Sequence, residues 1–303
     1  MRISIGCALV AMTLLASGVA AGQTAAGSKA AQPAVLATVE LVQLTATVER
    51  GKQLVPLGPG TELREGDRLN TGARSRLLLK LADGSYVSLG EKGSLFFDHM
   101  QAREDGVFDA ALFVAEGAFR LTAGVIGKFA GKRELSVAVN NVATGVRGTD
   151  FWGKSSPESD IVCVIEGKVE VTPPGERPFT LDEPLTYYML EGNVSHPVAT
   201  ASVEQFSEWA AQTAEQEGRG IASRGGKWRI TVASPKKFGD AFAVYDALRR
   251  AGHAAEIVPA KAGEERVYGV RLANFQTEKD AKTVVEALKG DARLAKFQFK
   301  VGM

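Results

Sequence analysis

Five polar residues near the C-terminal end of the sequence have the types and spacing to bind an anionic ligand. They are Arg229, Thr231, Arg271, Gln298 and Lys300. Each alternates with apolar residues in one of the segments 228–232, 267–272 and 296–301. Alternate side chains of a strand point to opposite faces, so these residues are predicted to line a polar sheet face. Two arginines and a lysine on one face favour an acidic ligand.

The distribution of charge agrees with an acidic partner for this region. The formal net charge of the chain is only +1. Residues 225–303 nevertheless hold 15 Lys and Arg against 9 Asp and Glu, whereas the remainder holds 21 against 26. A basic C-terminal region favours an anionic ligand, although nucleic acid is not expected because the chain begins with an export signal.

Catalytic, metal-binding and cofactor-binding patterns are not found in the sequence. The three histidines, His99, His196 and His253, lie far apart, each without a Cys, His or Asp at metal-ligand spacing, and are expected on the surface or in loops. No phosphate-binding glycine loop, HExxH or GxSxG motif is present. We therefore expect no enzyme activity, no metal and no cofactor.

Two other segments contain residues that can carry chemistry. Arg147 and Asp150 flank Gly-Thr, and could clamp a turn or present a ligand-binding edge; a structural turn between strands is the favoured interpretation. Cys163 lies in the apolar run 161–165, where a buried thiol acts as a small apolar side chain.

The elements that would position the five polar residues form a strand–helix–strand, strand–helix–strand pattern. Strands are predicted at 228–232, 254–258, 267–272 and 296–301, and helices at 240–251 and 277–289. Both helices have apolar positions that can cover the apolar sheet face, namely Ala241, Val244, Tyr245, Leu248, Ala281, Val284, Val285 and Leu288. This order predicts a small α+β, ferredoxin-like βαββαβ domain with a four-stranded antiparallel sheet.

Residues 227–301 resemble the SPOR domain family. The resemblance rests on Ile230-Thr-Val-Ala233, Leu248-Arg-Arg-Ala-Gly252 and Tyr268-Gly-Val-Arg-Leu-Ala-Asn-Phe275. It implies binding to peptidoglycan glycan strands whose stem peptides have been removed, and a place at division sites. Removal of the peptide exposes one lactyl carboxylate on each muramic acid. The sequence departs from the family pattern at Thr231, where glutamine is common, at Gly269, where arginine is common, and at Ala273-Asn274, which replaces Gly-Pro.

The central region, residues 35–200, has a β pattern throughout. Apolar runs meet Asp83-Gly84, Glu116-Gly117 and Glu166-Gly167, and an alternating strand follows each pair. Glycine adopts the positive φ of tight turns, so three hairpins are predicted here. The glycines are unequally spaced, which favours a sandwich or an irregular β-roll over a solenoid.

Residues 54–173 resemble the FecR-type periplasmic domain. The resemblance is carried in order by Pro59-Gly-Thr61, Glu65-Gly-Asp67, Thr71-Gly72, Asp83-Gly-Ser85, Glu116-Gly117, Val146-Arg-Gly-Thr-Asp-Phe151 and Val164-Ile-Glu-Gly-Lys-Val169. In founding members this domain relays a signal from an outer-membrane receptor to a sigma factor. The resemblance implies a protein partner in the cell envelope.

A helix is predicted over residues 203–217, between the β region and the C-terminal domain. Ser202 is a predicted N-cap, with Gln205 three residues on as in a capping box. Phe206 and Trp209 are expected to dock onto the β domain, although a partner-binding helix is the alternative. Glycines at 218, 220, 225 and 226 predict a linker.

The first 21 residues have the pattern of an export signal. Arg2 precedes an apolar run from Ile3 to Leu15, and small residues up to Ala21 fit a peptidase site. A transmembrane anchor is the alternative, but Ser17 and Gly18 interrupt the run. We expect a cleaved signal peptide, periplasmic localisation and a flexible stretch over residues 22–34.

The sequence thus predicts a signal peptide at 1–21, a flexible segment at 22–34, an all-β domain at 35–200, a helix and linker at 201–226 and a SPOR-like domain at 227–303. The predicted function is that of an exported, non-catalytic protein that binds peptidoglycan glycan strands, with the β domain as a scaffold or docking unit. The alternative is a periplasmic signal-relay component that acts through protein contacts of the FecR-like domain.

Overall fold

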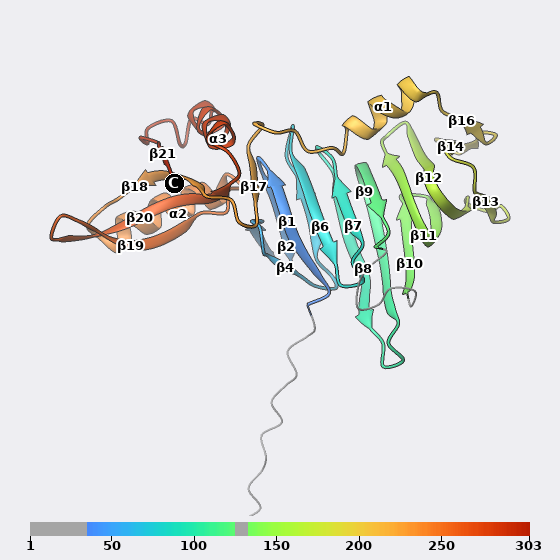
Figure 1. Cartoon of the computed structure of the whole chain (residues 1–303), viewed down its shortest axis with the longest axis horizontal. Coiled ribbons are helices and arrows are strands. Elements are labelled where there is room, and N and C mark those ends of the chain that lie inside the picture. Colours follow the sequence, from blue (N-terminus) through green and yellow to red (C-terminus); the bar gives the residue numbers. More distant parts are fainter. Residues whose placement is uncertain (1–34, 125–132) are drawn as a thin grey trace, which may run out of the picture. The chain divides into compact units, whose positions relative to one another are not determined.

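A computed structural model of the chain describes residues 35–124 and 133–303 (Figure 1). The predicted signal peptide and the segment 22–34 lie outside the described residues. The described residues form one compact unit, which is mostly β and contains more than one domain. None of the helices in the described part is long and apolar enough to span a membrane.

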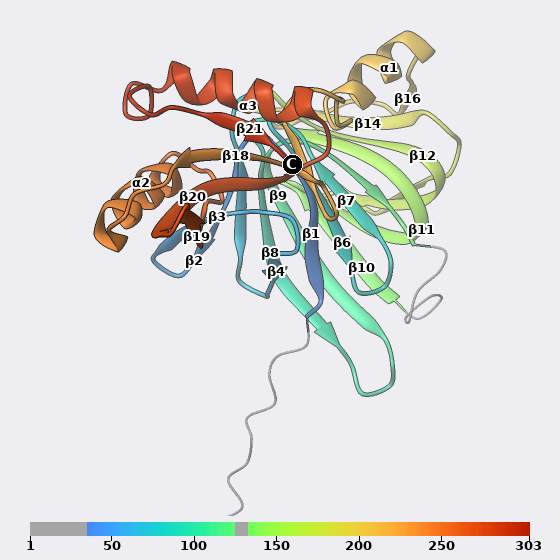
Figure 2. The same cartoon turned by 60° about the vertical axis from the view of Figure 1, so that its left-hand side comes forward.

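The central β region forms two layers of mainly antiparallel strands around one apolar core (Figures 1 and 2). Its shorter strands are β1 (Ala37–Gln43), β2 (Ala46–Arg50), β3 (Gln53–Pro56), β4 (Glu62–Leu63), β5 (Arg68–Thr71), β6 (Arg76–Leu81), β7 (Tyr86–Leu89), β8 (Ser94–Ala102), β10 (Arg133–Val139), β13 (Phe179–Leu181), β14 (Thr186–Glu191), β15 (Val194–Ser195) and β16 (Ala199–Thr200). One layer runs through β1, β6 and β7, and the other through β3, β2, β5 and β8. Fully buried side chains such as Leu79, Phe97 and Val164 fill the space between the layers.

Three long strands belong to both layers: β9 (Phe108–Thr122), β11 (Val142–Ser155) and β12 (Ser159–Thr172). The first half of β9 pairs with β8 and β10, and its second half with β7 and β11. Strand β11 pairs first with β10 and then with β9. Strands that pass from one sheet to another do so at bulges, and β9, β11 and β12 all carry one near their middle.

Two of the three predicted hairpins are therefore wrong. Gly84 forms the predicted turn between β6 and β7, with φ +86°. Gly117 (φ +91°) and Gly167 (φ +85°) lie instead inside the continuous strands β9 and β12. A glycine with positive φ can form a bulge as readily as a turn, because both need the same left-handed backbone.

The segment from Arg147 to Asp150 is also part of a strand. The sequence predicts a turn here, but these residues lie in β11, where the pairing with β12 shifts register. Gly148 (φ +61°) faces Gly167 across this bulge, so the turn-forming residues bend the long strand rather than end it.

Helix α1 (Val203–Ala211) docks on the outer surface of the β region, as the sequence predicts. The Trp209 ring stacks on the buried Trp152 ring, with centroids 5.0 Å apart, and Phe206 packs in the same cluster. Ser202 caps the helix by accepting the Gln205 N–H. Cys163 is buried in this cluster, and burial raises the pKa of its thiol to about 12.

The predicted helix 203–217 ends earlier, at Ala211, because the following residues bond elsewhere. The Thr213 hydroxyl donates to the Ala210 carbonyl, and the Gln216 N–H donates to the Gln43 side chain. The predicted linker then contains a strand, β17 (Ile221–Ser223), which pairs with β1 and meets β20.

The C-terminal region has the predicted order of elements. They are β18 (Trp228–Ala233), α2 (Phe238–Arg250), β19 (Glu256–Ala262), β20 (Glu265–Phe275), α3 (Glu278–Gly290) and β21 (Lys300–Gly302). The strands lie side by side in the order β21–β18–β20–β19, and every pair is antiparallel (Figure 2). The last strand is shorter than the predicted 296–301, since only its final residues reach β18.

The bulge at Gly167 gives a testable prediction about stability. A Cβ at position 167 would lie 2.8 Å from the Gly148 carbonyl oxygen, on a backbone with positive φ. Gly167→Ala should lower the free energy of unfolding by about 1–2 kcal/mol in urea titrations. Gly145→Ala, in the same strand pair, is the control, because its Cβ would meet nothing closer than Glu170 at 3.8 Å. Equal stability of the two variants would contradict the bulge account.

Candidate functional site

Three of the five predicted site residues form a row across the C-terminal sheet. Lys300 pairs with Thr231, which pairs with Arg271, and Arg271 in turn pairs with Glu256. The neighbouring positions Ile230 and Leu272 are buried with the apolar residues of α2 and α3. Since side chains alternate along a strand, the row lies on the face that the helices leave open.

Arg229 lies beside this row, opposite a bulge. It is exposed and pairs with Gly302. On its other side, two residues of β20, Ala273 and Asn274, stand opposite this single residue of β18, and Asn274 has φ +69°. Ala273-Asn274, which replaces the family's Gly-Pro, forms this bulge. Because a bulge changes the direction of nearby side chains, it can affect the orientation of Arg229.

Gln298 is not part of the sheet. It is exposed, and it precedes β21 instead of lying within it. Because the last strand is shorter than predicted, the alternation assumed for Gln298 and Lys300 holds only for Lys300, which is exposed on β21.

Sequence reasoning missed Glu256, which holds Arg271. The Arg271 Nε donates to Glu256 Oε1 at 2.6 Å, and the two side chains are 31% and 45% exposed. A partly exposed pair of this kind contributes about 0.2–1 kcal/mol, so an incoming carboxylate can compete for the guanidinium. Neither Arg229 nor Lys300 makes an ion pair with another described residue.

Gly269 leaves room for a further side chain on this face. It lies two residues before Arg271 on β20, and a Cβ there would meet only the Val258 carbonyl oxygen at 3.5 Å. This is an ordinary contact distance, so the absence of the family's common arginine is not imposed by the backbone.

The open face thus presents three cations, Arg229, Arg271 and Lys300, and the carboxylate of Glu256 beside Arg271. Strand-borne side chains are held in fixed order, with about 4.8 Å between neighbouring strands. Guanidinium and ammonium groups in such an order can bind a ligand that carries several separated carboxylates. Chemically, the face can hold an extended anion.

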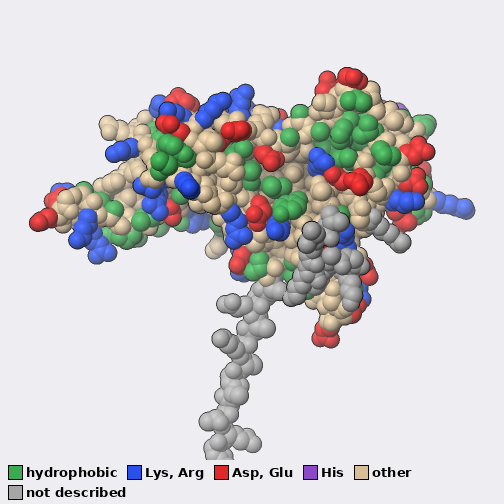
Figure 3. Space-filling view, viewed as in Figure 1, with side chains coloured by type: hydrophobic (Ala, Val, Ile, Leu, Met, Phe, Trp, Pro, Cys, Tyr) green, Lys and Arg blue, Asp and Glu red, His purple; other side chains and the backbone are tan. Residues whose placement is uncertain are grey.

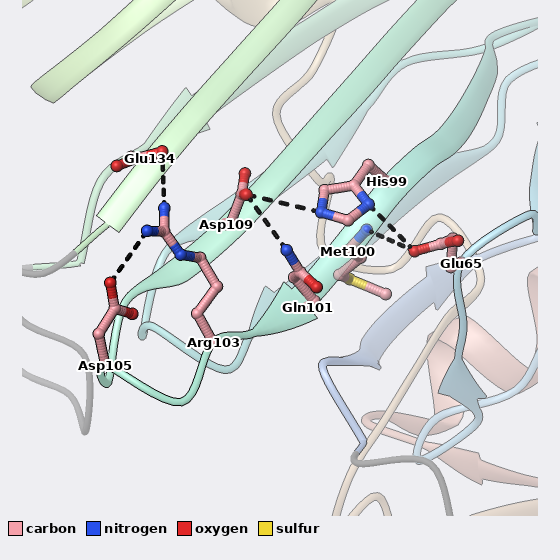
Figure 4. Close-up of polar contacts among 8 residues, drawn as sticks. All are labelled: Glu65, His99, Met100, Gln101, Arg103, Asp105, Asp109 and Glu134. Carbon is pink, nitrogen blue, oxygen red and sulfur yellow. Dashed lines mark hydrogen bonds and ion pairs between the residues drawn. The ribbon is translucent and has the colours of Figure 1, made fainter.

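The three histidines are not part of the row of Lys300, Thr231 and Arg271 on the open face. His99 on β8 contacts Glu65 at 3.3 Å and Asp109 on β9 at 3.5 Å, which sequence spacing did not indicate (Figure 4). His196 contacts Glu191 at 3.0 Å. Across the described residues, no group of three or more His, Cys, Asp and Glu side chains is placed to hold a metal ion.

His253 differs from the expected surface histidine. It lies half-buried in the turn after α2 and lines a cavity of about 200 Å³ with Leu57, Pro59 and Glu256. Burial lowers the pKa of this imidazole to about 4, against a weaker opposing effect of Asp291. The side chain is therefore neutral near pH 7.

In the Arg147–Asp150 segment, the side chains of Thr149 and Asp150 form hydrogen bonds within the β region. The Asp150 carboxylate accepts two hydrogen bonds from Arg120, at 2.9 and 2.6 Å. The Thr149 hydroxyl donates to the Lys168 carbonyl at 2.6 Å. These bonds join the three long strands where they bend.

Comparison with known families identifies two parts of the chain. Residues 67–170 match the family described as FecR protein, and residues 224–299 match the SPOR domain. The chain thus carries a FecR domain followed by a SPOR domain, in the predicted order.

Solved structures add little to this. Two crystal structures of a "putative anti-sigma factor" from Parabacteroides distasonis match with 15% and 14% identity. Each match covers 74% of this chain and 91% of the other, at a TM-score of 0.39, which is too low to bear on function. No curated protein matches the chain.

The depressed pKa of His253 predicts how stability depends on pH. Between pH 6.5 and 4 the unfolded chain binds a proton at His253 that the folded chain does not, so stability falls as the pH falls. Over this range the protein should lose about 2 kcal/mol more than a His253→Gln variant, in urea titrations at both pH values. An equal loss of unfolding free energy in the unchanged protein and the His253→Gln variant would show that the imidazole is not desolvated.

Proposed function

We propose that the protein is an exported, non-catalytic protein that binds peptidoglycan glycan strands through the open face of its C-terminal sheet. One observation carries the proposal, namely the row of Lys300, Thr231 and Arg271 beside Arg229. The match of residues 224–299 to the SPOR domain supports it, because that family suggests peptidoglycan binding.

The spacing of the cations suits a glycan without stem peptides. Lys300 and Arg271 lie two strands apart, or about 10 Å, which is comparable to the length of a disaccharide. Each muramic acid of such a strand carries one free lactyl carboxylate. Arg271 can exchange Glu256 for this carboxylate, while Arg229 and Lys300 have no competing acid among the described residues.

The wider organisation belongs to the same proposal. The C-terminal domain, residues 227–303, has a ferredoxin-like arrangement, and the segment 201–226 joins it to a β domain at 35–200. Cleavage near Ala21 releases the chain, with its segment 22–34, into the periplasm. There the open face holds the protein on wall from which amidases have removed peptides, as at sites of cell division.

The β domain serves as a scaffold or as a docking unit for an envelope protein. Hydrophobic side chains gather over α1 (Figure 3). Val194, Val198 and Val203, at and before α1, are 62%, 47% and 70% exposed. This apolar surface favours a second candidate function, a signal-relay component that acts through protein contacts of the FecR domain.

Sedimentation with purified sacculi tests the proposed function. The protein should sediment more after the sacculi are treated with amidase, because the treatment exposes lactyl carboxylates. Arg229→Ala/Arg271→Ala should weaken binding at least about tenfold, since two charge-assisted contacts are lost. Arg250→Ala/Lys289→Ala removes the same charge from the two helices and should bind as the unchanged protein does.

Two outcomes would overturn this account. Equal losses in both double variants would show only a general effect of charge. No sedimentation with either form of the wall would remove glycan binding, and the signal-relay function would then be favoured.

Gly269→Arg should strengthen binding to amidase-treated sacculi. The backbone there has room for a side chain, and the substitution adds a cation on the same face as Arg271. We expect affinity to rise about three- to tenfold at low salt, with the gain lost at high salt. Gly239→Arg adds the same charge on α2, where a Cβ would meet nothing within 4 Å, and should leave affinity unchanged. A gain of equal size in both variants would place the binding surface elsewhere.

A further inference from the structure

A second cationic site lies where the chain leaves α1. A pocket of about 600 Å³ opens beside the segment that follows this helix. Its lining includes three arginines, Arg74, Arg76 and Arg219, together with Glu91, Gln216 and Thr283. None of these residues belongs to the open face of the C-terminal sheet.

Arg76 is a buried charge without a carboxylate partner. Its side chain is on β6, and the residue is only 9% exposed. The guanidinium donates to two backbone carbonyls, those of Ser75 at 2.8 Å and Ala211 at 3.4 Å. Its Nε has no hydrogen-bond partner among the described residues. Burial lowers the pKa of Arg76, against a weaker opposing effect of Glu91.

Such burial needs compensation. Removing a charged group from water costs several kcal/mol unless a counter-charge and hydrogen bonds offset it. The carbonyl oxygens are neutral acceptors, and the effect of Glu91 is weaker than that of burial, so the two together supply only part of that compensation. An anion in the pocket would supply the rest.

The other two arginines leave their charges available at the same pocket. Arg74 and Arg219 are exposed, and no ion pair joins either side chain to a described carboxylate. The lining also holds two acids. Glu286 pairs with Lys289 at 2.7 Å, whereas Glu91 accepts the backbone N–H of Arg74 at 2.6 Å and keeps its charge. The three guanidinium groups therefore outnumber the carboxylates of the lining that lack a cationic partner.

The walls of the pocket are held in place before any ligand arrives. Leu44 and Arg74 both have left-handed backbones, with φ +62° and +56°, which cost about 1–2 kcal/mol each. The Gln43 side chain fixes both sides, donating to the Arg74 carbonyl at 3.0 Å and accepting the Gln216 N–H at 2.9 Å. Strain retained beside a buried unpaired cation is typical of a binding site.

We propose that this pocket binds a small oxyanion ligand, held by the guanidinium groups of Arg74, Arg76 and Arg219. Carboxylates and phosphates share this chemistry, since both accept paired hydrogen bonds from arginine. The volume admits a molecule larger than a single ion. The proposal does not depend on glycan binding at the sheet face.

Isothermal titration calorimetry at low salt tests the site with three probes. N-acetylmuramic acid supplies a carboxylate, inorganic phosphate supplies the alternative anion, and N-acetylglucosamine is the uncharged control. We expect the protein to bind at least one of the two anions in the millimolar range or tighter, and N-acetylglucosamine to give no heat. The anion that binds more tightly identifies the ligand class.

Variants separate this pocket from the sheet face. Arg74→Gln/Arg219→Gln changes only exposed side chains, so the fold should persist, and anion affinity should fall at least about tenfold. Arg177→Gln/Arg250→Gln removes the same charge from exposed positions outside both the pocket and the sheet face, and should leave anion affinity unchanged. Arg229→Gln/Arg271→Gln tests the sheet face separately. The pocket is excluded if neither anion binds at about 10 mM, or if the Arg74/Arg219 variant retains full affinity. Loss of anion binding only in the Arg229/Arg271 variant would assign the ligand to the sheet face instead.

Discussion

Burial of one face of the C-terminal sheet beneath two helices determines which of its side chains stay exposed. Ile230, Val232, Val270 and Leu272 all turn toward α2 and α3, and form one cluster with their apolar residues. The opposite face then receives every alternate residue of the same strands. Burial of the cations on this face would leave their charges without partners. Arg229, Arg271 and Lys300 therefore stay at the surface, where an anion from solution can reach them. Apolar packing on one face of the sheet therefore places the cationic side chains on the other face.

The segment between the two domains is bound on both sides. The Leu44 N–H donates to the Gly220 carbonyl, and the Gly220 and Ile221 N–H groups donate to the buried carboxylate of Asp280. Asp280 also accepts from Thr277, completing the capping box of α3. One carboxylate thus caps a helix and holds the connecting chain. The cationic pocket lies along this segment, with Gln216 and Arg219 in its lining.

The sequence predicted the parts of this structure that depend on local periodicity. Alternation along the strands placed Thr231, Arg271 and Lys300 on one face, and helical spacing identified the buried positions of α2 and α3. It did not distinguish a turn glycine from a bulge glycine, so Gly117 and Gly167 were assigned to hairpins. The Glu256–Arg271 pair depends on the register between β19 and β20, which residue types alone do not fix. The short strand β17 forms through tertiary pairing with β1, and nothing in Ile221–Ser223 marks it as a strand.

Mapping of the glycan on the protein by backbone amide NMR tests the central claim most directly. Addition of glycan chains that carry no stem peptides should shift the amide signals of β18, β20 and β21 around Thr231, Arg271 and Lys300. The signals of α2 and α3 should stay nearly unchanged, because both helices lie on the other face of the sheet. Shifts confined to the helices, or no shifts at saturating glycan, would contradict binding through the open face.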